Sequence, residues 1–293
     1  IYRDCDELQQ GFVRATRLMV RLMEERTSDG YVFRTDLRLR PDAGATPLAV
    51  STVAAENYYE SLGQNWERAA LIKARAVASD THSAKIFLDR LRPFIWRRHL
   101  DFAAIQDIHS IKRQINAHKG GGTIAVEGHD LKLGRSGIRE IEFFAQTQQL
   151  IWGGRDARLR EITTRGALGA LVEAGRVEAE VAEVLMDAYR FLRTVEHRVQ
   201  MAADAQTHSL PEDPKKLERL SAFLGYETIY RFRAELLAHL STVAKHYAVL
   251  FKDSAPLSAP NDSAGSLVFT GVENDPETLK TISELGFDDP DSV

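Results

Sequence analysis

Apolar residues recur at helical spacing through most of residues 51–252, and this pattern predicts that most of the 293-residue chain folds as packed helices. The expected helices cover residues 9–26, from 51 to about 62, 66–77, 84–98, 104–117, 138–151, 164–174, 179–204, 214–224 and 229–251. In the helix expected over 179–204, one apolar stripe persists for four turns. Its members should be buried, and they are Leu185, Tyr189, Leu192, Val195 and Val199.

Residues 31–40 change to a period of two, with apolar side chains at odd positions and charged ones at even positions. This alternation predicts a β-strand with one dry face and one polar face, which Pro41 ends. Residues 123–133 are a candidate short hairpin. The residues alone therefore indicate an α+β chain that is mostly α.

Charge and cysteine content narrow the function classes. The net charge of -4 gives no general attraction to nucleic acid or to an anionic membrane. Cys5 is the only cysteine, which rules out an internal disulfide and fits a reducing cytoplasm. No apolar run approaches the roughly 20 residues that a membrane-spanning helix needs.

The alternating segment carries the most chemistry, because Asp36 stands among Arg34, Arg38 and Arg40 on its charged face. One interpretation is a nucleotide site in which Asp36 helps to bind a divalent metal and an arginine holds phosphate oxygens. The other is an exposed face crossed by salt bridges, which the pattern alone favours. A single carboxylate is too few for a metal site.

Two further segments offer cations for a phosphate. Lys73 and Arg75 follow Glu67 on an expected helix, where they either face a phosphate pocket or support the helix through ion pairs. A glycine-containing loop at 132–137 opens the helix that carries Arg139, so an anion could bind there, although an ordinary turn with an Arg139–Glu142 pair fits equally well. The histidines show no metal-ligand spacing, and no Walker loop is present.

Three phrases, in the order in which they occur, resemble the glutamine synthetase adenylyltransferase family: FRTDLRLRPDAG, YYESLGQNWERAALIKARAVASD and KLGRSGIREIEFFAQTQQLIWGGR. The resemblance covers residues 18–251, and LVFTGVENDPETLKTISELGF resembles the family's connection between its two halves. One half of such enzymes adds AMP to a tyrosine of glutamine synthetase, and the other removes it by phosphorolysis and releases ADP. The wording after Ile138 is similar to the N-terminal, removing half, since the adding half usually has Asp in place of Glu140.

The resemblance implies a division of the chain. Residues 1–86 would be the C-terminal part of a truncated nucleotidyltransferase domain like that of DNA polymerase β, residues 87–252 a helical bundle domain, and residues 253–293 a linker towards a second half. The uridylyltransferase that modifies the PII signalling protein is related through its helical domain.

The resemblance also implies roles for single residues. The superfamily holds Mg²⁺ with an Asp-x-Asp pair after a Gly-Ser motif and with a later Asp, whose position Asp36 matches. Asp4 and Asp6 lack the preceding strand and Gly-Ser loop, so the chain alone is expected to be catalytically incomplete. Asp36, Arg38 and Arg40 are the implied catalytic residues, and the implied nucleotide or phosphate contacts are Lys73, Arg75 and Arg139.

The implied partners are glutamine synthetase, the PII protein, ATP or ADP, and phosphate. Two alternatives stay open. The chain could belong to the adding half, with ATP as the donor, or it could be a non-catalytic helical module that docks glutamine synthetase or PII.

Overall fold

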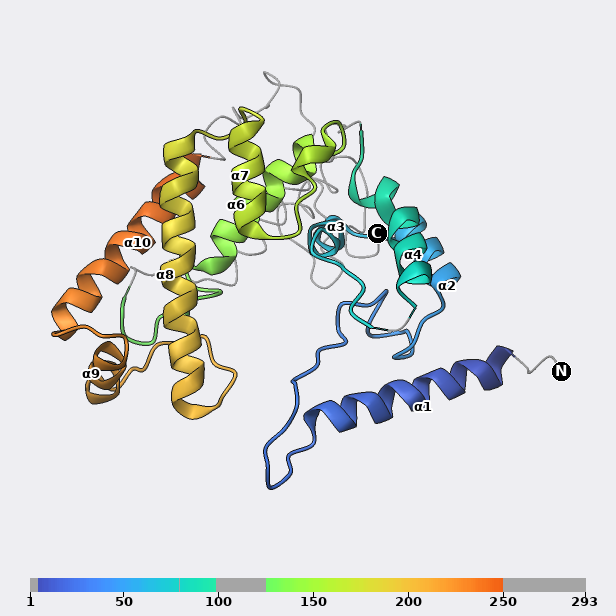
Figure 1. Ribbon diagram of the computed structural model, residues 1–293, viewed down its shortest axis with the longest axis horizontal. Helices are drawn as coiled ribbons and strands as arrows, with labels where there is room; N and C mark the ends of the chain where they lie inside the picture. The colour runs from blue at the N-terminus through green and yellow to red at the C-terminus, as the bar shows by residue number, and fades with distance from the viewer. Residues whose placement is uncertain (1–4, 79, 99–124, 250–293) are drawn as a thin grey trace, which may run out of the picture. The chain divides into compact units, whose positions relative to one another are not determined.

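The computed structural model describes residues 5–78, 80–98 and 125–249 (Figure 1). The chain divides into two units, Ile1–Val249 and Leu250–Val293, and every described residue lies in the first. The helix expected over 104–117 and the linker expected from 253 lie outside the described residues. The helices are α1 (Cys5–Glu24), α2 (Thr52–Ser61), α3 (Asn65–Leu71), α4 (Thr81–Ile95), α6 (Ile138–Trp152), the 3₁₀ helix η1 (Ala157–Leu159), α7 (Thr164–Glu173), α8 (Ala179–Ala203), α9 (Pro214–Phe223) and α10 (Ile229–Val249).

Side-chain caps mark where several of these helices begin. The Oγ atom of Ser51 accepts a hydrogen bond from the backbone N–H of Ala54, 3.2 Å away, at the start of α2. Asp213 does the same for the N–H of Lys216 at 3.0 Å, directly before Pro214 opens α9. Because the first N–H groups of a helix lack partners within it, such caps place a helix start from local sequence alone.

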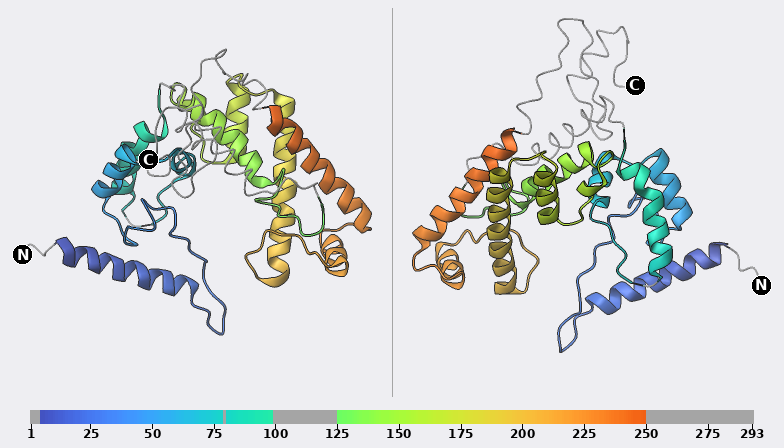
Figure 2. Two further views of the ribbon diagram at one scale, coloured as in Figure 1. Left: turned by 180° about the vertical axis from the view of Figure 1, so that it is seen from behind. Right: turned by 45° about the horizontal axis from the view of Figure 1, so that its top comes forward.

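Helices α6 to α10 form a bundle in which α8 packs against its neighbours α6, α7, α9 and α10 (Figures 1 and 2). Four members of the stripe predicted for α8 are buried, namely Leu185, Leu192, Val195 and Val199. Tyr189 is only half-buried, and its hydroxyl group donates to a carboxylate oxygen of Glu142, 3.2 Å away. The helices that the spacing predicts over 138–151, 164–174, 179–204, 214–224 and 229–251 are confirmed.

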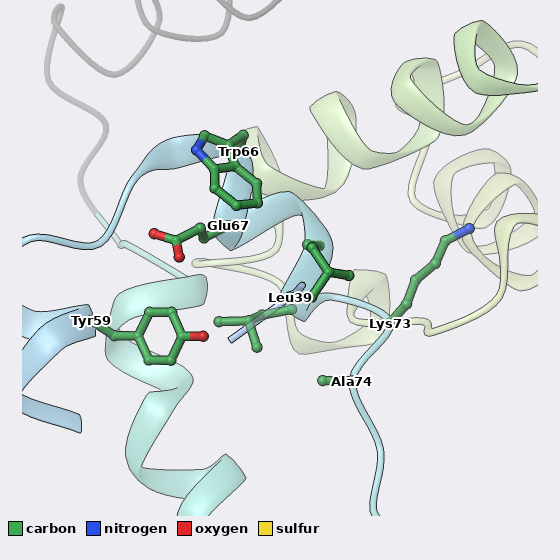
Figure 3. Close-up of a pocket in the computed structure, with 8 residues that line it drawn as sticks. Leu39, Tyr59, Trp66, Glu67, Lys73 and Ala74 are labelled. Atoms are coloured by element: carbon green, nitrogen blue, oxygen red, sulfur yellow. The ribbon is translucent and has the colours of Figure 1, made fainter. Parts of the chain in front are cut away.

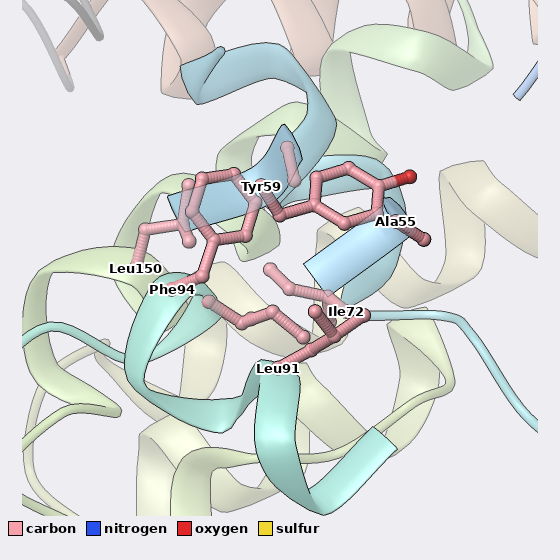
Figure 4. Close-up of a cluster of buried hydrophobic side chains, with 8 residues drawn as sticks. Ala55, Tyr59, Ile72, Leu91, Phe94 and Leu150 are labelled. Carbon is pink, nitrogen blue, oxygen red and sulfur yellow. The ribbon is translucent and has the colours of Figure 1, made fainter. Parts of the chain in front are cut away.

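A second apolar cluster holds α2, α3 and α4 together and reaches α6 through Leu150 (Figure 4). The rings of Tyr59 and Phe94 lie at its centre, with centroids 5.3 Å apart. The domain boundary expected at residues 86 and 87 falls inside α4, which packs on α2 and α3. The division into domains stays a prediction.

Residues 31–40 form no β-strand, and this part of the prediction is wrong for the described structure. A strand needs a neighbour for its backbone ladder, and the described residues supply none. The segment is held instead by the end of α1: the N–H groups of Val32 and Phe33 bond the carbonyl oxygen of Met23 at 3.0 and 2.9 Å. The apolar side chains stay in solvent, with Phe33 64% and Leu39 70% exposed.

The candidate hairpin also fails in its described part, residues 125–133. This stretch consists of turns and one isolated bridge between Asp130 and Ser209. A chain that is mostly α is therefore confirmed, whereas the described residues contain only isolated β-bridges. No helix in the described ranges has an apolar stretch long enough to cross a lipid bilayer.

Candidate functional site: a groove beside helix α3

Helix α3 is fixed firmly in place by two buried charged residues. Glu67 accepts hydrogen bonds from the Gln64 N–H at 2.8 Å and the Tyr58 hydroxyl group at 3.2 Å, and burial raises the pKa of its carboxyl group. The guanidinium group of Arg68 is buried and donates to the carbonyl oxygen of Ile95, 3.1 Å away at the end of α4. The elements beside α3 therefore rest on a rigid support.

A groove of about 620 Å³ lies along one side of α3 and contains two of the predicted catalytic residues, Arg38 and Arg40. Tyr58, Trp66 and Glu67 contribute to its wall. The side chain of Arg38 is 85% exposed, although its Nε and Nη2 atoms donate to the carboxylate of Asp36. The groove thus combines two guanidinium groups with an aromatic wall and with the carboxyl groups of Asp42 and Glu67.

A smaller pocket of about 250 Å³ shares Trp66 and Glu67 with the groove (Figure 3). Its other walls are mostly apolar and include Leu39 and Tyr59. The stem of Lys73 lines it too, but the ammonium group points away from the other labelled side chains (Figure 3).

Asp36 forms a close ion pair with Arg38. Arg38 lines the groove, whereas Asp36 lines neither cavity. The Nε atom of Arg38 lies 3.0 Å from both carboxylate oxygens, and Nη2 lies 2.6 Å from Oδ2. Hydrogen bonds from the side chain and backbone of Arg38 lower the pKa of Asp36 to about 2. Asp36 is therefore an exposed, ionised carboxylate, but both of its oxygens are already engaged.

The described residues around Asp36 do not make a magnesium site. No group of three or more His, Cys, Asp or Glu side chains among them is arranged to hold a metal ion. A single carboxylate cannot supply the six oxygen ligands that Mg²⁺ usually takes. Magnesium binding by Asp36 stays a prediction that needs ligands from outside the described residues.

Arg40 has a mainly structural position. Its guanidinium group donates to the carbonyl oxygens of Leu37 at 2.8 Å, Ala43 at 2.7 Å and Thr46 at 3.1 Å. A fourth bond, from Nε, reaches the carbonyl oxygen of Pro47 at 3.2 Å. Arg40 thus closes the loop after residue 40 and leaves Arg38 as the groove's more available cation.

The three predicted phosphate contacts are not brought together. Helix α3 ends at Leu71, short of the predicted end at residue 77, and Lys73 leaves it to bond Glu142 at 2.9 Å and the Thr164 hydroxyl group at 3.2 Å. Arg75 and Arg139 are exposed and line neither cavity.

An ionic network that spacing did not reveal links α3 to the bundle. The Oε1 atom of Glu142 accepts from Lys73 at 2.9 Å, Arg193 at 3.0 Å and Tyr189 at 3.2 Å. The Nη1 atom of Arg193 also donates to Oε2 of Glu196, 2.7 Å away. The expected Arg139–Glu142 pair is therefore not what the structure forms, because buried Glu142 turns towards cations from distant segments.

The second glutamate of the network is almost fully buried. Glu196 binds Arg193 through Oε2 and meets Nδ1 of His208 at 2.8 Å through Oε1. Burial lowers the pKa of Arg193, but the hydrogen bonds to Glu196 and Tyr189 and the charge of Glu142 outweigh it and raise the value. The only sequence signal for this network was the presence of charged residues on α6 and α8, which does not identify partners.

Comparison with known proteins relates the chain to a class of enzymes. Residues 3–90 match the family profile described as glutamate-ammonia ligase adenylyltransferase, and residues 108–251 match the one described as PII-uridylyltransferase. Both descriptions name enzymes that transfer nucleotidyl groups. The chain is thus related to nucleotidyltransferases along most of its length.

Individual relatives are more specific. Proteins named bifunctional glutamine synthetase adenylyltransferase/adenylyl-removing enzyme are 56% identical over 293 residues in Agrobacterium fabrum and 55% identical over 288 residues in Rhizobium meliloti. A Bartonella quintana protein of the same name is 51% identical over 285 residues. These alignments cover 97–100% of this chain and 29% of each relative. The chain belongs to the family of these bifunctional enzymes and spans somewhat over a quarter of their length.

Proposed function

We propose that this chain is part of an enzyme that removes AMP from the adenylyl-tyrosine of glutamine synthetase by phosphorolysis. The observation that carries the proposal is the 56% identity over all 293 residues to a protein named for both adenylyl transfer and adenylyl removal. The phrase that begins at Ile138 supports the removing half, since Glu140 stands where the adding half usually has Asp.

The groove beside α3 supplies the chemistry that this chain contributes. An oxygen of inorganic phosphate forms a bond to the adenylyl phosphorus while the bond to the tyrosine oxygen breaks, which yields ADP and the free tyrosine. The phosphate's proton ends on the tyrosine oxygen. Arg38, in the groove and exposed, would stabilise negative charge on the phosphoryl oxygens. Arg40, which also lines the groove, would add positive charge there.

The proposed partners follow from the relatives. Glutamine synthetase would be the substrate, and adenine nucleotide and phosphate would occupy the groove. The match of residues 108–251 to a PII-uridylyltransferase profile supports the PII protein as a partner of the bundle. Asp36 would act as a catalytic carboxylate and a magnesium ligand once Arg38 turns to the phosphate.

The substitution Asp36→Asn, made in a protein of the relatives' full length, tests the proposal. Phosphate-dependent release of ADP from adenylylated glutamine synthetase should fall by roughly 10²–10³, as expected for a lost charge-stabilising group. Addition of AMP from ATP should persist. If only the addition of AMP is lost, the chain belongs to the adding half. If both activities are retained, the chain is a non-catalytic docking module.

Asp156→Asn is a matched control. Asp156 binds Arg158 in the same way, with Nε at 3.0 Å from Oδ1 and Nη2 at 2.6 Å from Oδ2, and its pKa is likewise lowered to about 2 by Arg158. The arginine of each pair is exposed and Asp156 is 26% exposed, so both variants should melt within a few degrees of the wild type. Only Asp36→Asn should lose activity.

A further inference from the structure

Two cavities of different chemistry meet at one wall beside α3. The larger groove carries Arg38 and Arg40, and the smaller pocket is lined mainly by apolar side chains. Trp66 and Glu67 belong to both linings, so the two cavities adjoin at these residues. A nucleotide has this same division, with an apolar planar base at one end and an anionic phosphate at the other.

Trp66 differs from the other two tryptophans. Trp96 lies under the guanidinium group of Arg160, 5.7 Å from the ring centroid, and Trp152 lies under Arg176 at 3.9 Å. Trp66 has no ring or cation contact within the described part of the chain and is 45% exposed. Its indole face is therefore available to another planar group.

The size of the smaller pocket limits its occupant. Its volume of about 250 Å³ is below the roughly 300–1,000 Å³ typical of pockets that hold whole drug-sized ligands. One fused ring system suits this space, and most of the side chains that line it are apolar, among them Leu39, Tyr59 and Leu71.

We propose that this pocket binds the nucleobase, with the adenine ring stacked on Trp66 and the attached phosphate beside Arg38 in the groove. The inference rests on the proposed function and adds the residue that recognises the base. Trp66 would be a binding residue for the base, and Arg38 the binding residue for the phosphate.

Binding to the 293-residue chain tests the inference, with AMP, ribose 5-phosphate and inorganic phosphate measured by calorimetry without added metal. Stacking of one base on an aromatic side chain is worth about tenfold or more in affinity. AMP should therefore bind at least about tenfold more tightly than ribose 5-phosphate. Trp66→Leu should remove this difference and leave the affinity for ribose 5-phosphate unchanged.

Two further variants complete the design. Ala70→Leu fills the pocket from α3 while keeping Trp66, and it should abolish the advantage of AMP in the same way. Tyr230→Leu removes an aromatic side chain on α10 that is 76% exposed and lines neither cavity, so it should change no affinity. Far-ultraviolet circular dichroism and melting curves confirm that each variant is folded.

The outcomes separate the inference from the proposed function. If AMP and ribose 5-phosphate bind the wild type equally, or if AMP keeps its advantage in Trp66→Leu and Ala70→Leu, the base subsite is wrong. The proposed function survives that result as long as Arg38→Gln weakens all three ligands. If no phosphate compound binds in an Arg38-dependent way, both proposals fail.

Discussion

At the scale of single residues, the Oε1 atom of Glu142 is the acceptor at which Lys73, just after α3, meets cationic and hydroxyl groups of the bundle. It accepts from Lys73, Arg193 and Tyr189, and its side chain is 16% exposed. Burial raises the pKa of Glu142, but the hydrogen bond and charge of Lys73 and the charge of Arg193 outweigh it and lower the value below 4.5. The ionised form therefore stabilises the fold.

Glu142→Gln should lower the free energy of unfolding at pH 7 by about 3 kcal/mol, the lower end for a buried ion pair that loses one partner. Because the pKa of Glu142 is lowered in the fold, its contribution is complete above 4.5 and is lost as the pH falls through the folded value. Urea titrations from pH 7 to pH 3 should show the two stabilities converging in acid. Glu183→Gln, at an exposed position of α8, is the control and should track the wild type.

Lys73→Met keeps the apolar stem and removes only the ammonium group. Glu142 retains Arg193 and Tyr189, so the cost in unfolding free energy should be about 2 kcal/mol, below that of Glu142→Gln. The same urea titrations measure it. A cost equal to or above that of Glu142→Gln would mean that Lys73, and not Arg193, is the main partner of the carboxylate.

At the scale of helices, two glycines differ in whether close packing leaves room for a side chain. A Cβ atom at Gly63, between α2 and α3, would lie 2.6 Å from a ring carbon of Phe94 and 2.7 Å from the carbonyl oxygen of Tyr59. A Cβ atom at Gly169, inside α7, would meet nothing within 4 Å. The first glycine is required by packing, and the second is not.

Gly63→Ala and Gly169→Ala should therefore change stability in opposite directions. Gly63→Ala must displace Phe94 or the backbone of α2, and overpacking of this kind costs about 1–3 kcal/mol. Gly169→Ala should stabilise the fold by about 0.5–1 kcal/mol, because alanine is the better residue inside a helix. Thermal melts of the two variants give the signs directly, and a stabilised Gly63→Ala would show that α2 and α4 are not packed as described.

At the scale of the whole molecule, the N-terminal region exposes more apolar surface than the bundle does. Helix α1 presents a row of apolar side chains to solvent, namely Leu8, Phe12, Leu18, Met19 and Leu22. The segment 31–40 adds Phe33 and Leu39, and it retains the alternation of a strand without a strand partner. The chain spans 29% of the length of its relatives, so a longer protein has ample residues to cover this surface.

We expect this surface to be covered in a protein of the relatives' full length. Backbone amides of α1 and of residues 31–40 should exchange with deuterium at least about tenfold more slowly there than in the 293-residue chain, because they gain packing and a ladder. Mass spectrometry of peptides measures the exchange in both proteins. Amides inside α8 should exchange equally in the two proteins, and equal exchange of α1 would contradict the expectation.

The sequence by itself was enough for the helices of the bundle and for the family. The hydrogen bonds of a helix join residues four apart, so spacing and local caps such as Ser51 and Asp213 place helices without knowledge of the rest of the fold. The three family phrases likewise depend only on residue order, and the relatives bear them out.

Only the tertiary structure decided the state of residues 31–40 and the partners of the charged residues. A strand depends on a neighbour that can lie anywhere in the chain, and the alternation of Phe33 to Arg40 carries no information on whether one is present. Lys73 and Glu142 are 69 residues apart, so their spacing could not predict the pair. Helices are determined by local contacts, whereas strands, ion pairs and cavities are determined by segments that meet only after folding.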